Sequence, residues 1–222
     1  MPTQKLHQIA DAETTEALRS RLLIPCRPTS TPCTYCGAEP EIGHEDLCKG
    51  AARRWIARHN QITRAFIKTL ASRADLQVEG EPRATQGTQN SSAPSAPNSS
   101  TPSDETSLRA DFSVLLGSSR YYYDVQIVAI NKDSAREDAY ATLTEAADAK
   151  RRKYRALGAF FEPLIFSAGG LMESGTSKAY KSLQKLLGPA RAHWLDNQIA
   201  LTLTQARATA AASIAQNPSA RY

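Results

Sequence analysis

The chain has 222 residues, of which 41% are hydrophobic, enough to bury the core of one large domain or of a domain with an accessory module. Lys and Arg number 27 against 22 Asp and Glu, and the formal charge of +5 suits a polyanionic partner without demanding one. No apolar run approaches the roughly 20 residues of a membrane span, and the N-terminus lacks the apolar core of a signal peptide, so we expect an intracellular protein without a membrane partner.

Residues 1–25 are expected to form a helical flank. The pattern from Asp11 to Leu23 predicts a short helix, which Pro25 and Pro28 end. We assign this stretch no chemical role.

Residues 26–50 carry a pattern typical of a structural zinc site. The candidate ligands are Cys33, Cys36, His44 and Cys48. Zinc takes four sulfur or nitrogen ligands in a tetrahedron, which a close Cys pair and a close His/Cys pair can supply. Such a site has no open position for a substrate, so its expected role is to fold the segment. Cys26 remains over and can replace one of the four ligands.

The stretch Gly50–Arg73 has the apolar periodicity of an amphipathic helix with a strongly basic remainder. Its first turns contain Arg53, Arg54 and Arg58. A basic helix directly after a zinc site can lie along a phosphate backbone, but it can equally be a solvated helix face. We interpret His59 as a polar or packing residue.

A short strand, Leu76–Glu79, follows and ends at Glu81-Pro82. Residues 83–107 are almost purely polar and small, so they cannot bury enough surface to form structure of their own. We interpret them as a flexible insertion within one domain that covers residues 51–188, because the helix and strand before them would otherwise lack a sheet partner. Glu81 is a candidate third acid for the site predicted next.

A β-hairpin is predicted around the turn Gly117-Ser118-Ser119. Its strands are Asp111–Leu116 and Tyr121–Val128, which are rich in aromatic and β-branched residues. With the turn centred on Ser118 and Ser119, Asp111 is expected opposite Gln126 and diagonal to Asp124. The two carboxylates would then converge closely enough to share a divalent cation, which would compensate their charge in otherwise apolar strands. The simpler interpretation is that each acid meets water.

A long helix is predicted from Ser134, where a capping box begins, to a stop at Gly158. The basic run Lys150–Lys153 lies in its last turns, where cations complement the helix dipole. Lys150 or Lys153 can also point at the acids. A buried strand, 160–167, and helices at 176–187 and 190–215 complete the chain, with residues 189–222 as a C-terminal helix and tail.

The predicted order of helix, three strands, helix and strand is that of restriction-like PD-(D/E)XK nucleases, and Arg109-Ala110-Asp111 and Asp124-Val125-Gln126 resemble their aspartate and (D/E)-x-K elements. The closer resemblance is to the C-terminal zinc-knuckle and endonuclease region of the reverse transcriptases of site-specific non-LTR retrotransposons. It rests on Cys33/Cys36/His44/Cys48, Arg54…Arg58-His59, Glu81-Pro82, Asp111, Asp124-Val125 and Lys150…Lys153-Tyr154, in the family's order, over roughly residues 30–170. Two positions depart from the family: Arg109 stands where a proline is expected, and Gln126 replaces the water-positioning lysine.

This resemblance implies an α/β restriction-like core with a mixed sheet, an N-terminal zinc knuckle and C-terminal helices. It implies that Glu81, Asp111 and Asp124 bind Mg²⁺ or Mn²⁺ for phosphodiester hydrolysis, with Gln126 and Lys150 or Lys153 orienting the attacking water. DNA or RNA would be contacted by Arg53, Arg54, Arg58, Arg151 and Arg152, and a nuclear location follows. The alternative is a non-catalytic nucleic-acid-binding module that needs zinc alone.

Overall fold

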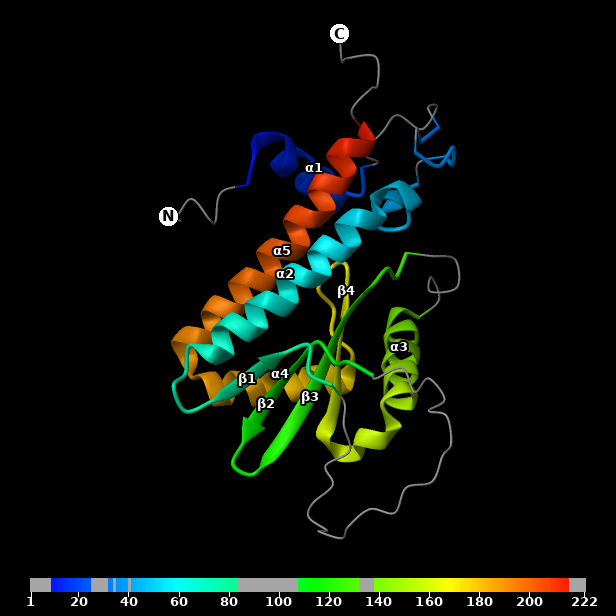
Figure 1. Cartoon of the computed structure of the whole chain (residues 1–222). Coiled ribbons are helices and arrows are strands. Elements are labelled where there is room, and N and C mark those ends of the chain that lie inside the picture. Colours follow the sequence, from blue (N-terminus) through cyan, green and yellow to red (C-terminus); the bar gives the residue numbers. More distant parts are fainter. Residues whose placement is uncertain are drawn as a thin grey trace, which may run out of the picture.

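A mixed four-stranded β-sheet forms the centre of the computed structural model (Figure 1). The structure describes residues 9–24, 32–33, 35–39, 41–83, 108–131 and 138–215. The strands lie side by side in chain order: β1 (Gln77–Gly80), β2 (Phe112–Leu116), β3 (Ser119–Val128) and β4 (Phe161–Ser167). The first three pair antiparallel, and β4 pairs parallel with β3. A three-stranded meander is thus extended by one crossover strand.

Helices cover both faces of this sheet. They are α1 (Asp11–Arg21), α2 (Ala52–Ala71), α3 (Ala139–Lys153), α4 (Ser174–Leu187) and α5 (Pro189–Ala215), with 3₁₀ turns at His44–Asp46, Lys49–Ala51 and Arg155–Phe160. Helices α2, α4 and α5 pack on one face and α3 on the other (Figure 1). The α/β class is confirmed, and α2, β1, β2, β3, α3 and β4 follow one another in the expected order. No helix in the described part of the chain is both long and apolar enough to cross a bilayer.

Alternating strand residues divide between two buried layers. On the α2 side, the ring of Phe112 stacks on that of Tyr123 with centroids 4.9 Å apart. On the α3 side, the ring of Tyr154 stacks on that of Phe161 at 4.3 Å. Asp124 follows Tyr123 on β3 and therefore points to the α3 side, because successive strand residues face opposite ways. One acid thus lies within the layer that α3 covers.

The turn between β2 and β3 consists of Gly117 and Ser118, because Leu116 pairs with Ser119. Gly117 has a φ of 61°, and a glycine with positive φ at the first central position is typical of a type II′ hairpin turn. The expected turn at Ser118 and Ser119 is therefore wrong by one residue, because the glycine belongs to the turn itself.

This register changes the neighbours of Asp111. Phe112 pairs with Tyr123, so Asp111, which precedes Phe112, lies beside Asp124 and not opposite Gln126 as predicted. The backbone N–H of Asp111 donates to the carbonyl of Tyr123 at 3.0 Å. The two acids are closer neighbours along the hairpin than the predicted diagonal arrangement made them.

The long helix predicted from Ser134 is described only from Asp138 onward. The carboxylate of Asp138 accepts a hydrogen bond from the backbone N–H of Tyr140 at 2.8 Å and so serves as the N-cap of α3. The predicted capping box at Ser134, the insertion beyond Arg83 and the spare Cys26 lie outside the described residues. At its other end α3 stops at Lys153, and 3₁₀ turns follow where the sequence predicted a helix up to Gly158.

Helix α5 joins the sheet to the segment that holds the predicted zinc ligands. Its first half contributes Leu195, Ile199 and Leu203 to the main apolar core. Its last turns form a separate buried cluster with Cys33 and Cys48. Helix α1 lies along the same end of α5 (Figure 1). The segment that contains Cys33, Cys36, His44 and Cys48, called the metal segment below, is therefore packed against the rest of the protein.

Candidate functional site

The four predicted zinc ligands converge. Cys33, Cys36, His44 and Cys48 place their ligand atoms within 4.8 Å of one another. The Sγ atoms of Cys33 and Cys48 are 3.7 Å apart, and Cys36 Sγ lies 3.4 Å from His44 Nε2. A tetrahedral site with Zn–S bonds of about 2.3 Å requires about 3.8 Å between two sulfurs and about 3.6 Å between sulfur and nitrogen. The cluster therefore fits a metal ion such as zinc.

Two left-handed glycines shape this cluster. Gly37, with φ 73°, closes the loop after Cys36, and its N–H donates to the carbonyl of Cys33 at 2.7 Å. Gly43, with φ 81°, precedes His44, and a Cβ there would lie 2.3 Å from the side-chain nitrogen of Asn131. Position 43 therefore requires glycine, because its backbone is left-handed and because a side chain there would collide with Asn131.

The thiols differ in their readiness to ionise. Burial disfavours the Cys33 thiolate, but hydrogen bonds from the backbone N–H groups of Tyr35 and Cys36 and from His44 lower its pKa to about 6. Burial and the neighbouring Cys33 raise the pKa of Cys48 to about 11. Adjacent sulfurs cannot all be charged without a cation between them, and a bound metal would supply that cation.

Asp124 and Lys150 form the centre of the second candidate site, between β3 and α3. The Asp124 side chain is only 6% exposed, and its Oδ1 lies 2.7 Å from Lys150 Nζ. A carboxylate in an apolar layer needs such compensation. Of the two lysines proposed to replace the missing motif lysine, Lys150 is the one that contacts the acid. Lys153 Nζ instead lies 4.8 Å from the ring centroid of Tyr154.

Asp111 is held beside Asp124 by the backbone of β3. Its Oδ2 accepts a hydrogen bond from the N–H of Val125 at 2.6 Å, and its Oδ1 lies 3.4 Å from His59 Nε2 of α2. The hydrogen bond with Asp111 raises the pKa of His59, and the charge of Asp124 acts in the same direction, while burial and Lys150 oppose it. Each acid therefore has a basic partner from a different helix.

His59 is the site residue that reasoning from helix periodicity missed. We interpreted it as a polar or packing residue, whereas it contacts Asp111. The available signal was its place in the Arg54…Arg58-His59 element of the resemblance, because no local pattern reveals a partner on a distant strand.

Tyr154 directly follows α3 and supports the site through a hydrogen bond to the chain near Asp111. It is 1% exposed, and its hydroxyl donates to the backbone carbonyl of Arg109 at 2.5 Å, which fixes the approach to Asp111. Burial raises the pKa of Tyr154, as does its contact with Asp124. Gln126 lies two residues beyond Asp124 on the same face of β3, half-buried and in register with Ile165 of β4.

Glu81 does not converge with the other two acids. Its backbone N–H donates to the carbonyl of Asp111 at 2.9 Å, but its side chain is 80% exposed and lies 4.0 Å from Arg109. Among the residues that the structure describes, the Cys/His cluster is the only group in which three or more potential ligands meet. A three-carboxylate site of Glu81, Asp111 and Asp124 is therefore not preformed.

The predicted phosphate-binding arginines fall into two groups. Arg58 is 4% exposed and pairs with Asp46, and Arg54 donates to the backbone carbonyl of Thr209. Arg151 lies 3.1 Å from Asp148. All three side chains have partners within the protein. Arg58 is also too buried to contact a phosphate.

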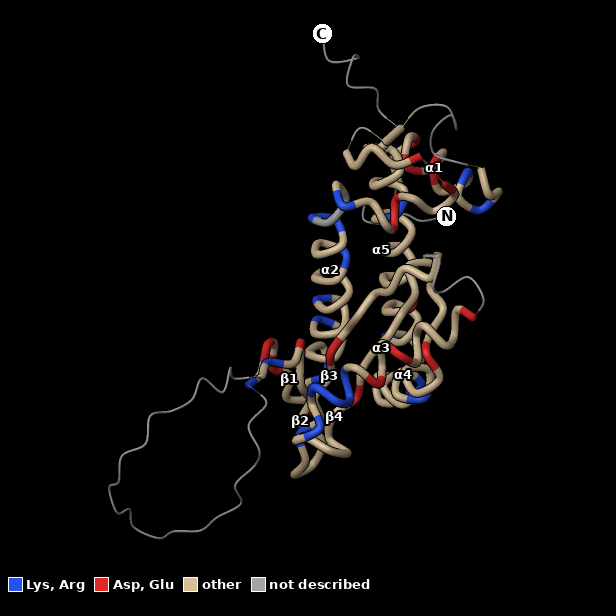
Figure 2. The backbone as a smooth tube through the Cα atoms, turned by 90° about the vertical axis from the view of Figure 1, so that its right-hand side faces the viewer, with Lys and Arg blue, Asp and Glu red and all other residues tan. Residues whose placement is uncertain are grey.

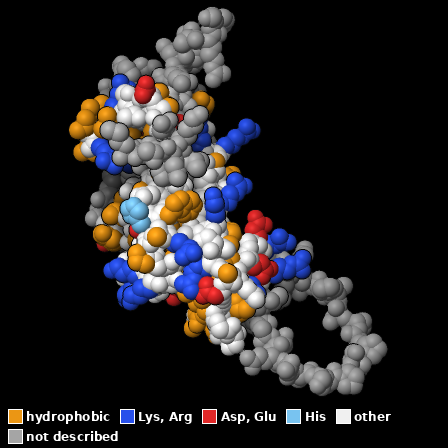
Figure 3. Space-filling view, turned by 90° about the vertical axis from the view of Figure 1, so that its left-hand side faces the viewer, with side chains coloured by type: hydrophobic (Ala, Val, Ile, Leu, Met, Phe, Trp, Pro, Cys, Tyr) orange, Lys and Arg blue, Asp and Glu red, His pale blue; other side chains and the backbone are white. Residues whose placement is uncertain are grey.

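Arg53 of α2 and Arg152 of α3 are exposed, as are Arg64 and Lys68 further along α2. Lys and Arg positions are spaced along the length of α2 (Figure 2). Figure 3 shows Lys and Arg side chains projecting from one face of the molecule, with acidic side chains beside some of them. Arg64 and Lys68 extend the basic surface beyond the residues we singled out from sequence.

Comparison with protein-family models gives no match, and no curated protein is significantly similar in sequence. Functional assignment therefore depends on the geometry of the residues.

Proposed function

We propose that the chain is a metal-dependent DNA endonuclease with a restriction-like core, akin to the target-nicking region of non-LTR retrotransposon reverse transcriptases. The observation that supports it most is the group formed by Asp111, Asp124 and Lys150. Two acids lie side by side on a hairpin, and a lysine from the following helix reaches the second acid at 2.7 Å. This arrangement resembles the acidic pair and lysine of a PD-(D/E)XK site, in which the lysine would come from α3 instead of β3.

The order of elements supports the same proposal. Helix α2, the meander β1–β3, the crossover helix α3 and the parallel strand β4 match the helix–strand–strand–strand–helix–strand order of that nuclease core. Asp111 directly precedes β2 and Asp124 lies on β3, the strands that carry the resemblance. Fold alone does not establish function, so the chemistry must come from the site.

The donor set suits a hard cation in part. Carboxylate oxygens are the ligands that Mg²⁺ prefers, and Asp111 and Asp124 bring two carboxylates together. Each acid now has a basic side-chain partner, Lys150 for Asp124 and His59 for Asp111. Binding of a divalent cation would require Lys150 to move, and its flexible, partly exposed side chain permits this.

Each residue then has a defined task. A bound Mg²⁺ or Mn²⁺ would stabilise charge on the phosphodiester and activate a water. Asp111 and Asp124 would hold the cation, and Lys150, released from Asp124, would orient the water together with Gln126. His59 would keep Asp111 in place.

Arg53 and Arg152 would contact DNA phosphates, which fix the position of a protein on DNA. The nuclear location belongs to this same proposal.

The test is nicking of plasmid DNA in Mg²⁺ and in Mn²⁺. Asp124→Asn should abolish nicking while leaving DNA binding equal or tighter, because a negative charge near the phosphates is removed. Asp148→Asn is the matched control, since it changes an exposed acid of α3 whose partner is Arg151, and nicking should persist. A wild-type protein that leaves DNA intact in both cations contradicts the proposal.

The alternative is a non-catalytic nucleic-acid-binding module. The pairing of Asp124 with Lys150 and of Asp111 with His59 favours it, because both acids have basic partners without a hard cation. It predicts salt-sensitive binding to DNA or RNA, dependence on zinc alone, and the same affinity with or without Mg²⁺.

A further inference from the structure

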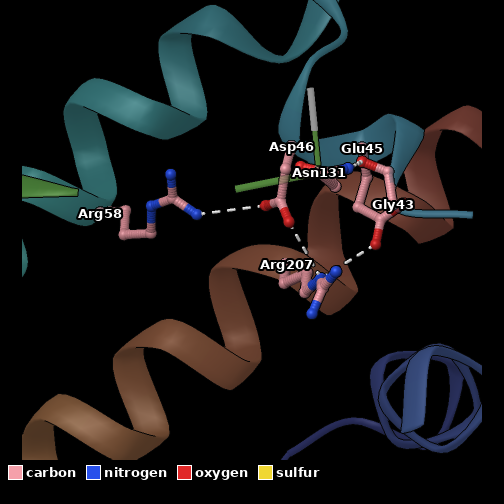
Figure 4. A network of polar contacts seen from close by, with 6 residues as sticks. All are labelled: Gly43, Glu45, Asp46, Arg58, Asn131 and Arg207. Carbon is pink, nitrogen blue, oxygen red and sulfur yellow. Dashed lines mark hydrogen bonds and ion pairs between the residues drawn. The ribbon is translucent and has the colours of Figure 1, made fainter. Parts of the chain in front are cut away.

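Four charged side chains meet where the metal segment contacts α2 and α5 (Figure 4). They are Glu45, Asp46, Arg58 and Arg207. Asp46 lies 3.4 Å from Arg58 and 3.1 Å from Arg207, and Glu45 lies 3.0 Å from Arg207. Two acids and two arginines balance each other, and Glu45, Asp46 and Arg58 are each no more than 6% exposed.

Stability alone does not account for this network. Buried ion pairs contribute little net stability, because desolvation offsets their attraction, but they can favour one relative orientation of the groups they join. The same segments are already held together by the apolar cluster of Cys33, Cys48 and the last turns of α5. The distinct contribution of the network is therefore the orientation of the metal segment against α2.

The network also links the two candidate sites. His44, a metal ligand candidate, shares one 3₁₀ turn with Glu45 and Asp46. Asp46 pairs with Arg58, which directly precedes His59 on α2, and His59 reaches Asp111 at 3.4 Å. A metal ion that fixes His44 thereby fixes the turn that anchors this part of α2.

We propose that Asp46 and Arg58 are positioning residues that couple metal binding at the Cys/His cluster to the placement of His59 against Asp111. The inference rests on the proposed function only in giving the His59–Asp111 pair a catalytic purpose, and the coupling is measurable without DNA. Linkage requires reciprocity, so the Asp46–Arg58 contact strengthens metal binding by the same factor by which the metal strengthens the contact.

The test compares Asp46→Asn with Glu45→Gln in the full chain. Both replace a buried acid of the same turn by its amide, but only Asp46 contacts Arg58. The readouts are zinc affinity, by competition with a chromophoric chelator, and the NMR signals of the His59 ring at one fixed pH. Chelation should shift the His59 signals of the wild type. Asp46→Asn should show shifted His59 signals even with zinc bound, and zinc affinity about tenfold weaker.

Glu45→Gln should keep the wild-type His59 signals in the zinc-loaded protein. If it shifts them as Asp46→Asn does, or if chelation leaves the wild-type signals in place, the coupling is overturned. Should chelation unfold the whole chain, zinc-loaded Arg58→Gln decides: shifted His59 signals support the coupling and unshifted ones overturn it. A protein that never nicks DNA but shows zinc-dependent His59 signals overturns only the nuclease proposal.

Discussion

Replacing Lys150 by methionine isolates the electrostatic role of the lysine at Asp124. Methionine keeps the length and apolar contacts of the stem and removes the charge. The Asp124 carboxylate is 6% exposed and would lose a partner at 2.7 Å. We expect the metal-free variant to be markedly less stable than the wild type, because a buried carboxylate without compensation is unfavourable.

The magnitude follows from the geometry. Two unit charges at this distance attract by about 6 kcal/mol at an effective dielectric constant of about 20. Desolvation of the pair offsets part of that, and breaking a fully buried pair costs about 3–5 kcal/mol. Lys150 is 23% exposed, which argues for the lower end, about 3 kcal/mol. For a chain of this size that corresponds to a melting temperature lowered by about 6–12 °C.

Thermal unfolding of Lys150→Met beside Lys153→Met provides the assay. Lys153 is exposed and its ammonium only faces the ring of Tyr154, so its loss should cost no more than about 1 kcal/mol. Mg²⁺ should then stabilise Lys150→Met more than the wild type, because no lysine competes for the acids; at ten times the dissociation constant the gain is about 1.4 kcal/mol. Equal melting temperatures for the two variants would refute the reasoning.

Three further outcomes are expected. Purified protein should contain one zinc per chain by elemental analysis, and Cys36→Ser should lose it and increase hydrogen exchange over residues 33–48 while leaving the sheet protected; a folded, zinc-free wild type would contradict this. Arg53→Ala should lower the slope of log affinity against log salt by about 0.9 for duplex DNA, whereas a salt-independent affinity would exclude phosphate contacts. Glu162 is a half-buried residue of β4, and burial raises its pKa above the unfolded value, so the folded state binds the proton more tightly and stability falls as pH rises through that window. Glu162→Gln should therefore stabilise the protein more at pH 7 than at pH 4 in urea unfolding, and an equal effect at both values would count against it.

The sheet and its covering helices were accessible from sequence because their signals are local. The periodicity of Gly50–Arg73 predicted α2, whose Phe66 and Leu70 are fully buried. Turn residues and β-branched runs predicted the hairpin, with strand ends within two residues of those observed. The convergence of Cys33 and the other three ligands followed from spacing alone, because zinc sites use close pairs.

What escaped prediction depends on contacts between distant segments. In the sequence, Arg53 and Arg58 are two similar arginines of one basic helix. Arg58 is nevertheless buried, because it pairs with Asp46 of a distant segment. The hairpin register shifted because Gly117 occupies the turn, which composition alone did not fix. Helix α5 lacks a regular apolar stripe because its two ends pack on different partners, the sheet and the metal segment.

The two aspartates that are buried in the described part of the chain show why only one of them is a candidate for metal chemistry. Asp46 contacts Arg207 as well as Arg58, and the side chains of the Asp46–Arg58 pair are only 4% and 5% exposed, so an ion that displaced Arg58 would leave a buried guanidinium without its partner. Asp124 is as buried, at 6%, but its partner Lys150 is 23% exposed and carries its charge on a flexible stem. Water can receive the Lys150 ammonium when another cation takes its place. The nuclease proposal requires a divalent ion to exchange with lysine at Asp124 while the Asp46–Arg58 pair stays closed.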